Sequence, residues 1–297
     1  MYGAILGDMI GAPFEFDRGN KTKDFLLFGV GSRYTDDTAM TLAVAKAIMK
    51  AGVGAGEKKM KQEFVRQMQE LGRRYAKGDY GARFISWIHS SDPEPYGSFG
   101  NGSAMRVSSV GWFFDTLERT REVARWSAEI SHNHTEGIKG AEATASVIFL
   151  ARNHKSKDEI KEYVIREFGY DLSRTCDEIR PTYRHMESCQ KTVPEAITAF
   201  LEGEDFEDVI RTAVSLGGDC DTLTCIAGSM AEAYFGVPGW MKAECEARLP
   251  GELLGILCDA QNIINKNNRR EKYGLFGLHG RAAFLGSGTG PVGGKDE

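Results

Sequence analysis

Two short segments, far apart in the chain, place aspartate and threonine directly before an apolar helical pattern. Residues 35–38 read Thr-Asp-Asp-Thr, and residues 217–222 read Gly-Gly-Asp-Cys-Asp-Thr. Oxygen ligands without histidine or cysteine are those that Mg²⁺, Mn²⁺ or Ca²⁺ prefer. Two such segments could hold a pair of cations about 3.5–4 Å apart, able to orient substrate oxygens and activate a water. The candidate ligands are Thr35, Asp36, Asp37, Asp219, Asp221 and Thr222.

Helix capping is the competing interpretation of both segments. Aspartate and threonine at the start of a helix accept hydrogen bonds from free backbone amides and suit the positive end of the helix dipole. One aspartate is enough for capping, and a dipole effect of at most ~1–2 kcal/mol per charge gives little reason to collect four. Metal binding is therefore favoured, and capping stays open.

A third acidic region lies at the amino terminus. Asp8 and Glu15 are seven residues apart, so a continuous helix would put them on one side. Pro13 is expected to end or bend that helix, leaving Glu15 on a loop that could approach a site. Taken alone, Glu15 is more simply interpreted as a surface residue. Gly7 and Gly11 share one helical face and permit close packing.

A glycine-rich loop at residues 97–103 precedes a helical stretch and carries Asn101 and Ser103. Its backbone amides could converge on a phosphate or pyrophosphate, although an ordinary tight loop fits the pattern equally well. It is neither a Walker loop, because no Gly-Lys-Ser/Thr follows, nor a dinucleotide-binding motif, because no buried strand precedes it.

Two histidines, His132 and His134, precede an alanine-rich helical stretch. They could contact phosphate or ribose. Considered alone, this segment is more simply interpreted as a helix cap with solvent-exposed side chains.

The elements that must position these residues are predicted to be helices. Apolar residues recur at helical spacing in Leu42–Met49, Phe64–Leu71, Val123–Ile130, Ala143–Ala151, Val193–Leu201, Val209–Leu216, Leu223–Phe235 and Leu253–Ile264. Runs that alternate between β-branched and polar residues, as strands do, are nearly absent. We expect an all-α bundle of crossed helices in one domain, residues 1–285, followed by a flexible glycine-rich tail, residues 286–297.

Composition is that of a folded, reduced protein. Of 297 residues, 41% are hydrophobic and 27% charged, and the net charge of −5 gives no basic footprint for nucleic acid. The six cysteines show no disulfide or zinc pattern, so we expect small buried thiols, among them Cys220 and Cys225. The amino terminus lacks a signal-peptide pattern and no apolar run reaches ~18 residues, which predicts a cytoplasmic protein that does not bind membranes.

Taken together, these segments resemble the ADP-ribosylglycohydrolase family, which includes the dinitrogenase reductase-activating glycohydrolases and the ADP-ribosyl-acceptor hydrolases. The resemblance spans about residues 3–285, and five motifs occur in the family's order. They are the Gly-Ala-Ile-Leu-Gly-Asp run at residues 3–8 with Glu15, Tyr34–Thr38, Gly100–Arg106, Ser131-His132 with Glu136-Gly137, and Gly217–Thr222.

The resemblance implies an orthogonal all-α fold with two Mg²⁺, or alternatively Mn²⁺, between the early and late acidic motifs. The six candidate ligands match the family's ligand positions, and Glu15 matches a glutamate on a mobile loop near the metals. The segments matching the ADP-ribose site contain Gly100, Asn101, Gly102, Ser103 and His132. The catalytic carboxylates would come from Glu15, Asp36 and Asp37, and the assignment of general acid and base among them stays open.

The implied activity is hydrolysis of the N-glycosidic bond between ADP-ribose and a modified acceptor, releasing ADP-ribose. Protein arginine is the favoured acceptor. Serine-linked, nucleic-acid-linked and small-molecule adducts remain alternatives, as does a family member that binds ADP-ribose without catalysis. Nucleic acid is expected only as a modified substrate.

One departure from the family bears on the acceptor. The stretch before the glycine-rich loop lacks, in obvious register, an aspartate of the nitrogenase-regulating members, and Asp92 or Glu94 could substitute. Two other helical enzyme classes fit poorly. A His-Asp phosphohydrolase needs a His-Asp dipeptide, which is absent, and a terpene synthase needs Asp-Asp-x-x-Asp, whereas Asp36-Asp37 lacks the last acid.

Overall fold

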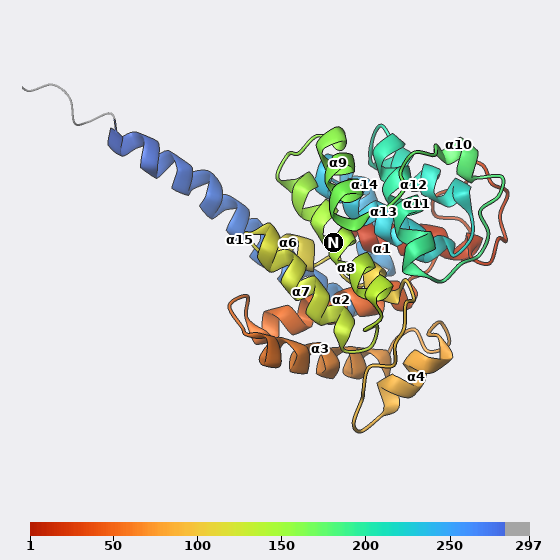
Figure 1. Cartoon of the computed structure of the whole chain (residues 1–297), viewed down its shortest axis with the longest axis horizontal. Helices are drawn as coiled ribbons and strands as arrows, with labels where there is room; N and C mark the ends of the chain where they lie inside the picture. Colours follow the sequence, from red (N-terminus) through yellow and green to blue (C-terminus); the bar gives the residue numbers. More distant parts are fainter. Residues whose placement is uncertain (283–297) are drawn as a thin grey trace, which may run out of the picture.

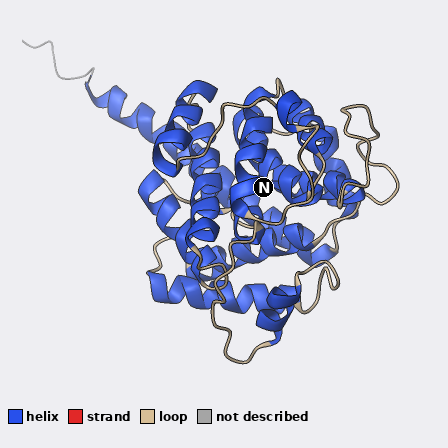
Figure 2. Ribbon diagram, turned by 45° about the vertical axis from the view of Figure 1, so that its right-hand side comes forward, coloured by secondary structure: helices blue, strands red, loops and turns tan. Residues whose placement is uncertain are grey.

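The chain folds into crossed helices joined by loops, in a computed structural model that describes residues 1–282 and side chains to residue 266. Figure 2 shows helices and loops but no strand in the described residues; one isolated bridge pairs Gly100 with Ser188. The all-α prediction is confirmed. The predicted tail, residues 286–297, lies outside the described residues, and the boundary at residue 285 stays a prediction.

All eight predicted apolar stretches lie in helices, apart from Ile130, which is the residue after its helix. In chain order the helices are α1 (Tyr2–Gly11), a short 3-10 helix (Ala12–Phe14), α2 (Asp36–Ala51), α3 (Glu57–Gly72), α4 (Ala82–His89), α5 (Gly102–Met105), α6 (Val110–Phe113), α7 (Leu117–Glu129), α8 (Thr135–Arg152), α9 (Lys157–Phe168), α10 (Cys176–Ile179), α11 (Cys189–Glu202), α12 (Phe206–Leu216), α13 (Cys220–Phe235), α14 (Gly239–Arg248) and α15 (Gly251–Ala282).

Helices α1 and α13 pack together at the centre of the molecule (Figure 1). Gly3, Gly7 and Gly11 form the contact face of α1, and a Cβ added at Gly7 would lie 2.2 Å from the Thr224 carbonyl oxygen of α13. Only glycine allows backbones to approach this closely. The predicted close packing through Gly7 and Gly11 is confirmed, and it sets where Asp8 lies relative to α13.

Local signals end and begin the helices around this centre. Pro13 lies in the 3-10 turn that follows α1, so Glu15 stands on a loop, as predicted. Thr35 caps α2 by accepting a hydrogen bond from the Asp37 amide. Helix α2 packs on α3 and α1, while the short α5 lies against α8 and α13. The last turns of α1 therefore meet the first turns of α2 and α13.

The cysteines are all free thiols, and Cys258 alone among them is exposed. Cys220 and Cys225 are buried in α13, as predicted. Within the described part of the chain, no helix combines the length and apolar character needed to cross a membrane.

We expect Gly7→Ala to lower the free energy of unfolding by about 1–3 kcal/mol or more, because the new methyl group would overlap the α13 backbone. Urea denaturation followed by circular dichroism measures the effect. Gly54→Ala is the control, since a Cβ there meets nothing within 4 Å. Equal stability of the two variants would contradict close packing of α1 on α13.

Candidate metal centre and substrate pocket

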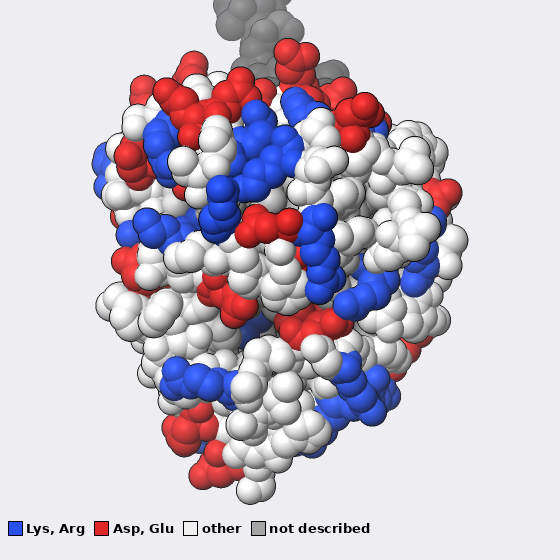
Figure 3. Space-filling view, turned by 90° about the vertical axis from the view of Figure 1, so that its right-hand side faces the viewer, with Lys and Arg blue, Asp and Glu red and all other residues white. Residues whose placement is uncertain are grey.

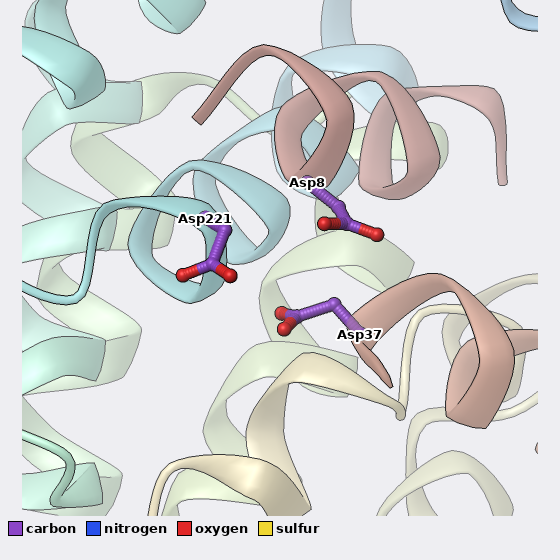
Figure 4. A group of neighbouring side chains, drawn as sticks. All are labelled: Asp8, Asp37 and Asp221. Carbon is purple, nitrogen blue, oxygen red and sulfur yellow. The ribbon is translucent and has the colours of Figure 1, made fainter. Parts of the chain in front are cut away.

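Three buried carboxylates from three helices point toward one another where α1, α2 and α13 meet (Figure 4). They belong to Asp8, Asp37 and Asp221, and one oxygen of each lies within 4.8 Å of the others. The Asp8 side chain is fully buried, and the other two are at most 4% exposed. Negative groups this close in a buried place repel one another unless protons or a cation compensate their charge.

Sequence reasoning did not include Asp8 among the site residues. Its carboxylate accepts hydrogen bonds from both the amide and the hydroxyl of Thr35, at 2.9 and 2.7 Å, and from the amide and hydroxyl of Thr38. Asp8 thus fixes the first turn of α2 from the side of α1. The partners are 27 and 30 residues away, so no local pattern marks Asp8 as part of the site.

A second carboxylate group shares one member with the first. Glu15, Asp219 and Asp221 also have oxygens within 4.8 Å of one another. The side-chain amide of Asn101 donates to Asp219 Oδ2 at 2.7 Å and to Thr192 Oγ1 at 3.0 Å, which orients that carboxylate. Because Asp221 belongs to both groups, the two candidate cation positions adjoin each other.

The loop carrying Glu15 is fastened by the residue two positions later. Asp17 accepts hydrogen bonds from the backbone amides of Gly218, at 2.9 Å, and His185, at 3.0 Å. Phe16 and Asp17 both have positive φ angles, 58° and 56°, which side-chain-bearing residues adopt at a cost in free energy. The hydrogen bonds of Asp17 therefore offset the strain of these two backbone conformations. They hold the loop in the position in which Glu15 lies beside Asp219 and Asp221.

Burial is the main influence on the titration of these carboxyl groups. Desolvation, followed by the charge of Asp221, raises the pKa of Asp8 to about 7 and that of Glu15 to about 7. The same two causes raise the pKa of Asp37 and of Asp219 well above the ordinary value. Without a cation, the folded site therefore holds protons that these groups release in the unfolded chain.

Capping accounts for only part of this arrangement. Thr35 caps α2, but Asp219, at the N-cap position of α13, makes no capping hydrogen bond. Asp37 Oδ1 is buried and has no hydrogen-bond partner among the described residues. An unpartnered carboxylate oxygen facing two other carboxylates fits a hard divalent cation. Helix α13 begins at Cys220, with Asp219 at its N-cap position and Asp221 in its first turn.

The remaining predicted ligands take different positions around the two groups. Thr222 donates from Oγ1 to Asp37 Oδ2 at 3.2 Å. Thr35 is 1% exposed, and its hydroxyl group donates a hydrogen bond to Asp8. Asp36 is partly exposed and lies outside both carboxylate groups, although desolvation and Asp221 raise its pKa well above the ordinary value. The roles predicted for these residues stay predictions.

A pocket of about 360 Å³ opens beside both carboxylate groups. Figure 3 shows one face of the molecule, on which acidic and basic side chains of the described residues are interspersed. The pocket's acidic side chains are Glu15, Asp36, Asp37, Asp79, Glu187, Asp219 and Asp221. Its other lining residues include Phe16, Arg83, Phe84, Tyr96, Gly100, Asn101, Gly102, Met105, Arg106, His132 and Thr222.

The glycine-rich loop lies at the pocket, but several of its polar groups already have partners. The Gly100 amide donates to Ser98 Oγ at 3.1 Å and the Asn101 amide to the Glu187 carbonyl at 3.0 Å. The Ser103 hydroxyl donates to the Gly137 carbonyl at 2.7 Å, and Ser103 is not among the pocket residues. The amides of Gly100 and Asn101 are therefore already used within the protein, and the ADP-ribose-binding roles of Gly100, Asn101, Gly102 and Ser103 stay predictions.

The two histidines have separate roles. His134 caps α8 through Nδ1, which accepts from the Glu136 amide at 3.1 Å, whereas His132 is 6% exposed and lines the pocket. Burial, then Arg106 and Arg83, lowers the pKa of His132 well below its ordinary value. The capping interpretation holds for His134, and solvent exposure is wrong for His132.

Asp79 is a pocket residue that sequence reasoning missed. It holds the Arg33 guanidinium with two hydrogen bonds of 2.8 Å. Asp92 and Glu94, suggested as substitutes for a family aspartate, line other surface hollows. Asp79 is in a loop between α3 and α4 with no distinctive pattern around it, and its place in the pocket is visible only in three dimensions.

Comparisons with known proteins agree with this architecture. A family model for ADP-ribosylglycohydrolase matches residues 1–270. ADP-ribosylhydrolase ARH3 of Gallus gallus is 28% identical, over 82% of this chain and 87% of that protein. ADP-ribosylarginine hydrolase Tri1 of Pseudomonas putida (strain GB-1) is 24% identical, over 80% and 70%. A solved ADP-ribosylglycohydrolase-related protein complex has the same fold, with a TM-score of 0.63 at 22% identity, covering 89% of this chain and 94% of that one.

The raised pKa values predict how a cation should affect stability. Asp8 and Glu15 have folded pKa values of about 7 against ordinary values of 3.8 and 4.5. In metal-free protein their contribution to stability is full below those ordinary values and is lost as the pH rises through about 7. A cation that replaces the protons should therefore stabilise the protein more at about pH 8 than at about pH 5.5.

We expect Mg²⁺ or Mn²⁺, at one fixed concentration of about 100 times its dissociation constant at pH 8, to raise the melting temperature by about 5 °C near pH 8. The same concentration should raise it by less near pH 5.5, where protons compete with the ion. Thermal unfolding of EDTA-treated protein, with and without the ion, measures this difference. If neither ion changes the melting temperature at either pH, the prediction of a metal centre is wrong.

Proposed function

The chain belongs to the ADP-ribosylglycohydrolase family, and we propose that it hydrolyses the bond between ADP-ribose and a modified acceptor with the help of two divalent cations. The family and its relatives are glycosidases that act on ADP-ribosylated substrates. The cations, their ligands and the acceptor are the parts that this proposal adds.

The shared carboxylate of Asp221 carries the proposal. It links one buried group, completed by Asp8 and Asp37, to a second, completed by Glu15 and Asp219. Two adjoining carboxylate groups that open on a pocket suit a pair of cations better than a single ion. Oxygen donors alone favour Mg²⁺, with Mn²⁺ as the alternative.

When bound, such cations orient substrate hydroxyl groups and lower the pKa of a bound water. The residues of the chain then divide the remaining work. Asp37, Asp219 and Asp221 would hold the ions, Asn101 orients Asp219, and Asp8 fixes the start of α2. Positive charge develops on the ribose as its glycosidic bond breaks, and the surrounding carboxylates stabilise that charge.

Glu15 is best placed among the predicted catalytic carboxylates to move a proton. It is half-buried, reaches the pocket from a loop, and has a pKa near 7 in the absence of a cation. In the proposed reaction, the water oxygen bonds to the anomeric carbon and the carbon–nitrogen bond breaks. Glu15 accepts a proton from the attacking water, and the departing nitrogen takes up one proton. Asp36 and Asp37 face the same pocket, and Asp37 is assigned to the cations.

Arginine is the proposed acceptor. Asp79 lines the pocket and already binds one guanidinium, that of Arg33, in a two-pronged arrangement suited to arginine recognition. A substrate arginine could take the same carboxylate in exchange. The relative from Pseudomonas putida is named an ADP-ribosylarginine hydrolase, which supports this choice. Serine-linked, nucleic-acid-linked and small-molecule adducts are the alternatives, as is binding of ADP-ribose without hydrolysis.

We expect Asp221→Asn to lower the rate of ADP-ribose release by roughly 100-fold or more, because one charge is lost from both carboxylate groups. Helical content should be retained, since the substitution preserves size. The rate is measured with saturating Mg²⁺, with saturating Mn²⁺ and after EDTA treatment, and the exposed Asp115→Asn serves as control. Near-normal turnover by a folded Asp221→Asn protein, or full activity of wild type without divalent ions, would refute the two-cation proposal.

We expect Asp79→Asn to lower kcat/KM for an ADP-ribosylated arginine peptide by about 10-fold or more, because a guanidinium loses its charged partner. Cleavage of a serine-linked peptide should change little. Asp92→Asn is the matched control, since Asp92 lies outside the pocket. If wild type cleaves the serine-linked peptide and leaves the arginine-linked one intact, arginine is the wrong acceptor.

A further inference from the structure

A buried arginine, Arg106, forms part of the pocket wall. Arg106 is 1% exposed, and its Nη2 donates to the Ser127 carbonyl at 2.6 Å and to Ser131 Oγ at 2.9 Å. It forms no ion pair within the part of the chain whose side chains are described. Its charge is therefore spread onto neutral dipoles, one of which is the Ser131 hydroxyl.

The Ser131 hydroxyl connects this arginine to His132. A guanidinium has donors only, so Ser131 Oγ must accept the hydrogen bond from Arg106. The Ser131 proton is then free to be donated to His132 Nδ1, which lies 2.8 Å away. If His132 Nδ1 were instead the donor to Ser131, then Ser131 Oγ would accept two hydrogen bonds and its own proton would have no acceptor. That arrangement is unfavourable because the Ser131 side chain is 0% exposed. The chain of bonds therefore makes Nδ1 an acceptor and puts the imidazole proton on Nε2.

The protonated Nε2 faces the glycine-rich loop. An ideal Cβ at Gly102 would lie 3.1 Å from this nitrogen and one at Gly100 3.4 Å, so the two glycines leave the space in front of it open. No acceptor for Nε2 is found in residues 1–266, and His132 lines the pocket. The rings of Phe84 and Tyr96 pack against the imidazole at centroid distances of 6.1 and 5.8 Å and hold its plane.

We propose that Arg106 and Ser131 are positioning residues that lock His132, which the family resemblance already places in the ADP-ribose site, as a neutral imidazole with its proton on Nε2, so that Nε2–H is held as the hydrogen-bond donor to the substrate diphosphate. This inference rests on the proposed function for the identity of the ligand. Arg106 does not contact the substrate in this proposal. It acts through Ser131, which accepts its hydrogen bond and donates to His132 Nδ1. The donor is thereby present across the neutral pH range without a protonation step.

The tautomer can be observed directly. In wild-type protein labelled with ¹⁵N-histidine, His132 should show a protonated Nε2 and an unprotonated Nδ1, unchanged between about pH 6 and about pH 8. Its signals are assigned by their loss in His132→Gln. A proton on Nδ1, or a doubly protonated ring at neutral pH, would overturn the proposal whatever the variants do.

Binding of ADP-ribose, followed by calorimetry in the presence of Mg²⁺, tests the role of the donor. We expect Ser131→Ala to lower the affinity for ADP-ribose about 10-fold, and His132→Phe to lower it at least as much. His132→Gln keeps a side-chain donor and should retain most of the affinity. Ser146→Ala is the matched control, because that buried serine bonds the Glu142 carbonyl on α8, away from the pocket. The thermal stabilisation by Mg²⁺ should be the same in all four variants.

The outcomes separate the two proposals. Wild-type affinity in Ser131→Ala and His132→Phe would refute contact of His132 with the diphosphate while leaving the proposed hydrolysis intact. If wild type fails to bind ADP-ribose at all, the proposed function fails and the diphosphate contact with it. The histidine signals then still decide the tautomer assigned by Arg106 and Ser131.

Discussion

Mutual repulsion among buried carboxylates is the constraint on which this structure depends. Asp8, Asp37 and Asp221 come from three helices, and each pair is close enough that both members ionise only with compensation from protons or a cation. The fold must hold them together against that repulsion. It does so through rigid contacts elsewhere: the glycine face that joins α1 to α13, and the two threonines of α2 that bond Asp8. Folding energy from packing is thus used to prepare a site for positive charge.

The same constraint explains why polar residues next to the carboxylate groups are fixed by hydrogen bonds to distant segments of the chain. Asn101 aims Asp219, while Asp17 ties the Glu15 loop to the turn before α13 despite unfavourable backbone angles. Each tie joins segments distant in sequence, and each supports a residue that faces the pocket. A ligand group held from behind by such bonds loses little further freedom when a cation or substrate arrives.

The sequence was sufficient to predict the helices whose apolar faces are broad, and the two aspartate segments at their starts. The apolar stretches did not include several helices, among them α4, α14 and α9, and in α9 Ile160, Val164 and Phe168 are the buried positions of an otherwise charged helix. The capping box formed by Ser156 and Glu159 could have identified that helix. No comparable local signal exists for Asp8 or Asp79 as site residues, because their importance comes from partners that only the tertiary fold brings near.

The pocket contains both acidic and basic side chains, which would orient an asymmetric substrate. Glu15, Asp37, Asp219 and Asp221 belong to the two carboxylate groups, whereas Arg83 and Arg106 lie close enough to His132 to lower its pKa. ADP-ribose has the same polarity, with a doubly charged diphosphate in its middle and a ribose that becomes positive as its glycosidic bond breaks. Diphosphate near the carboxylates would be repelled unless cations screened it, while ribose placed there gains stabilisation in the transition state. For the proposed substrate, the orientation that avoids repulsion would place the reacting carbon beside Asp221 and Glu15.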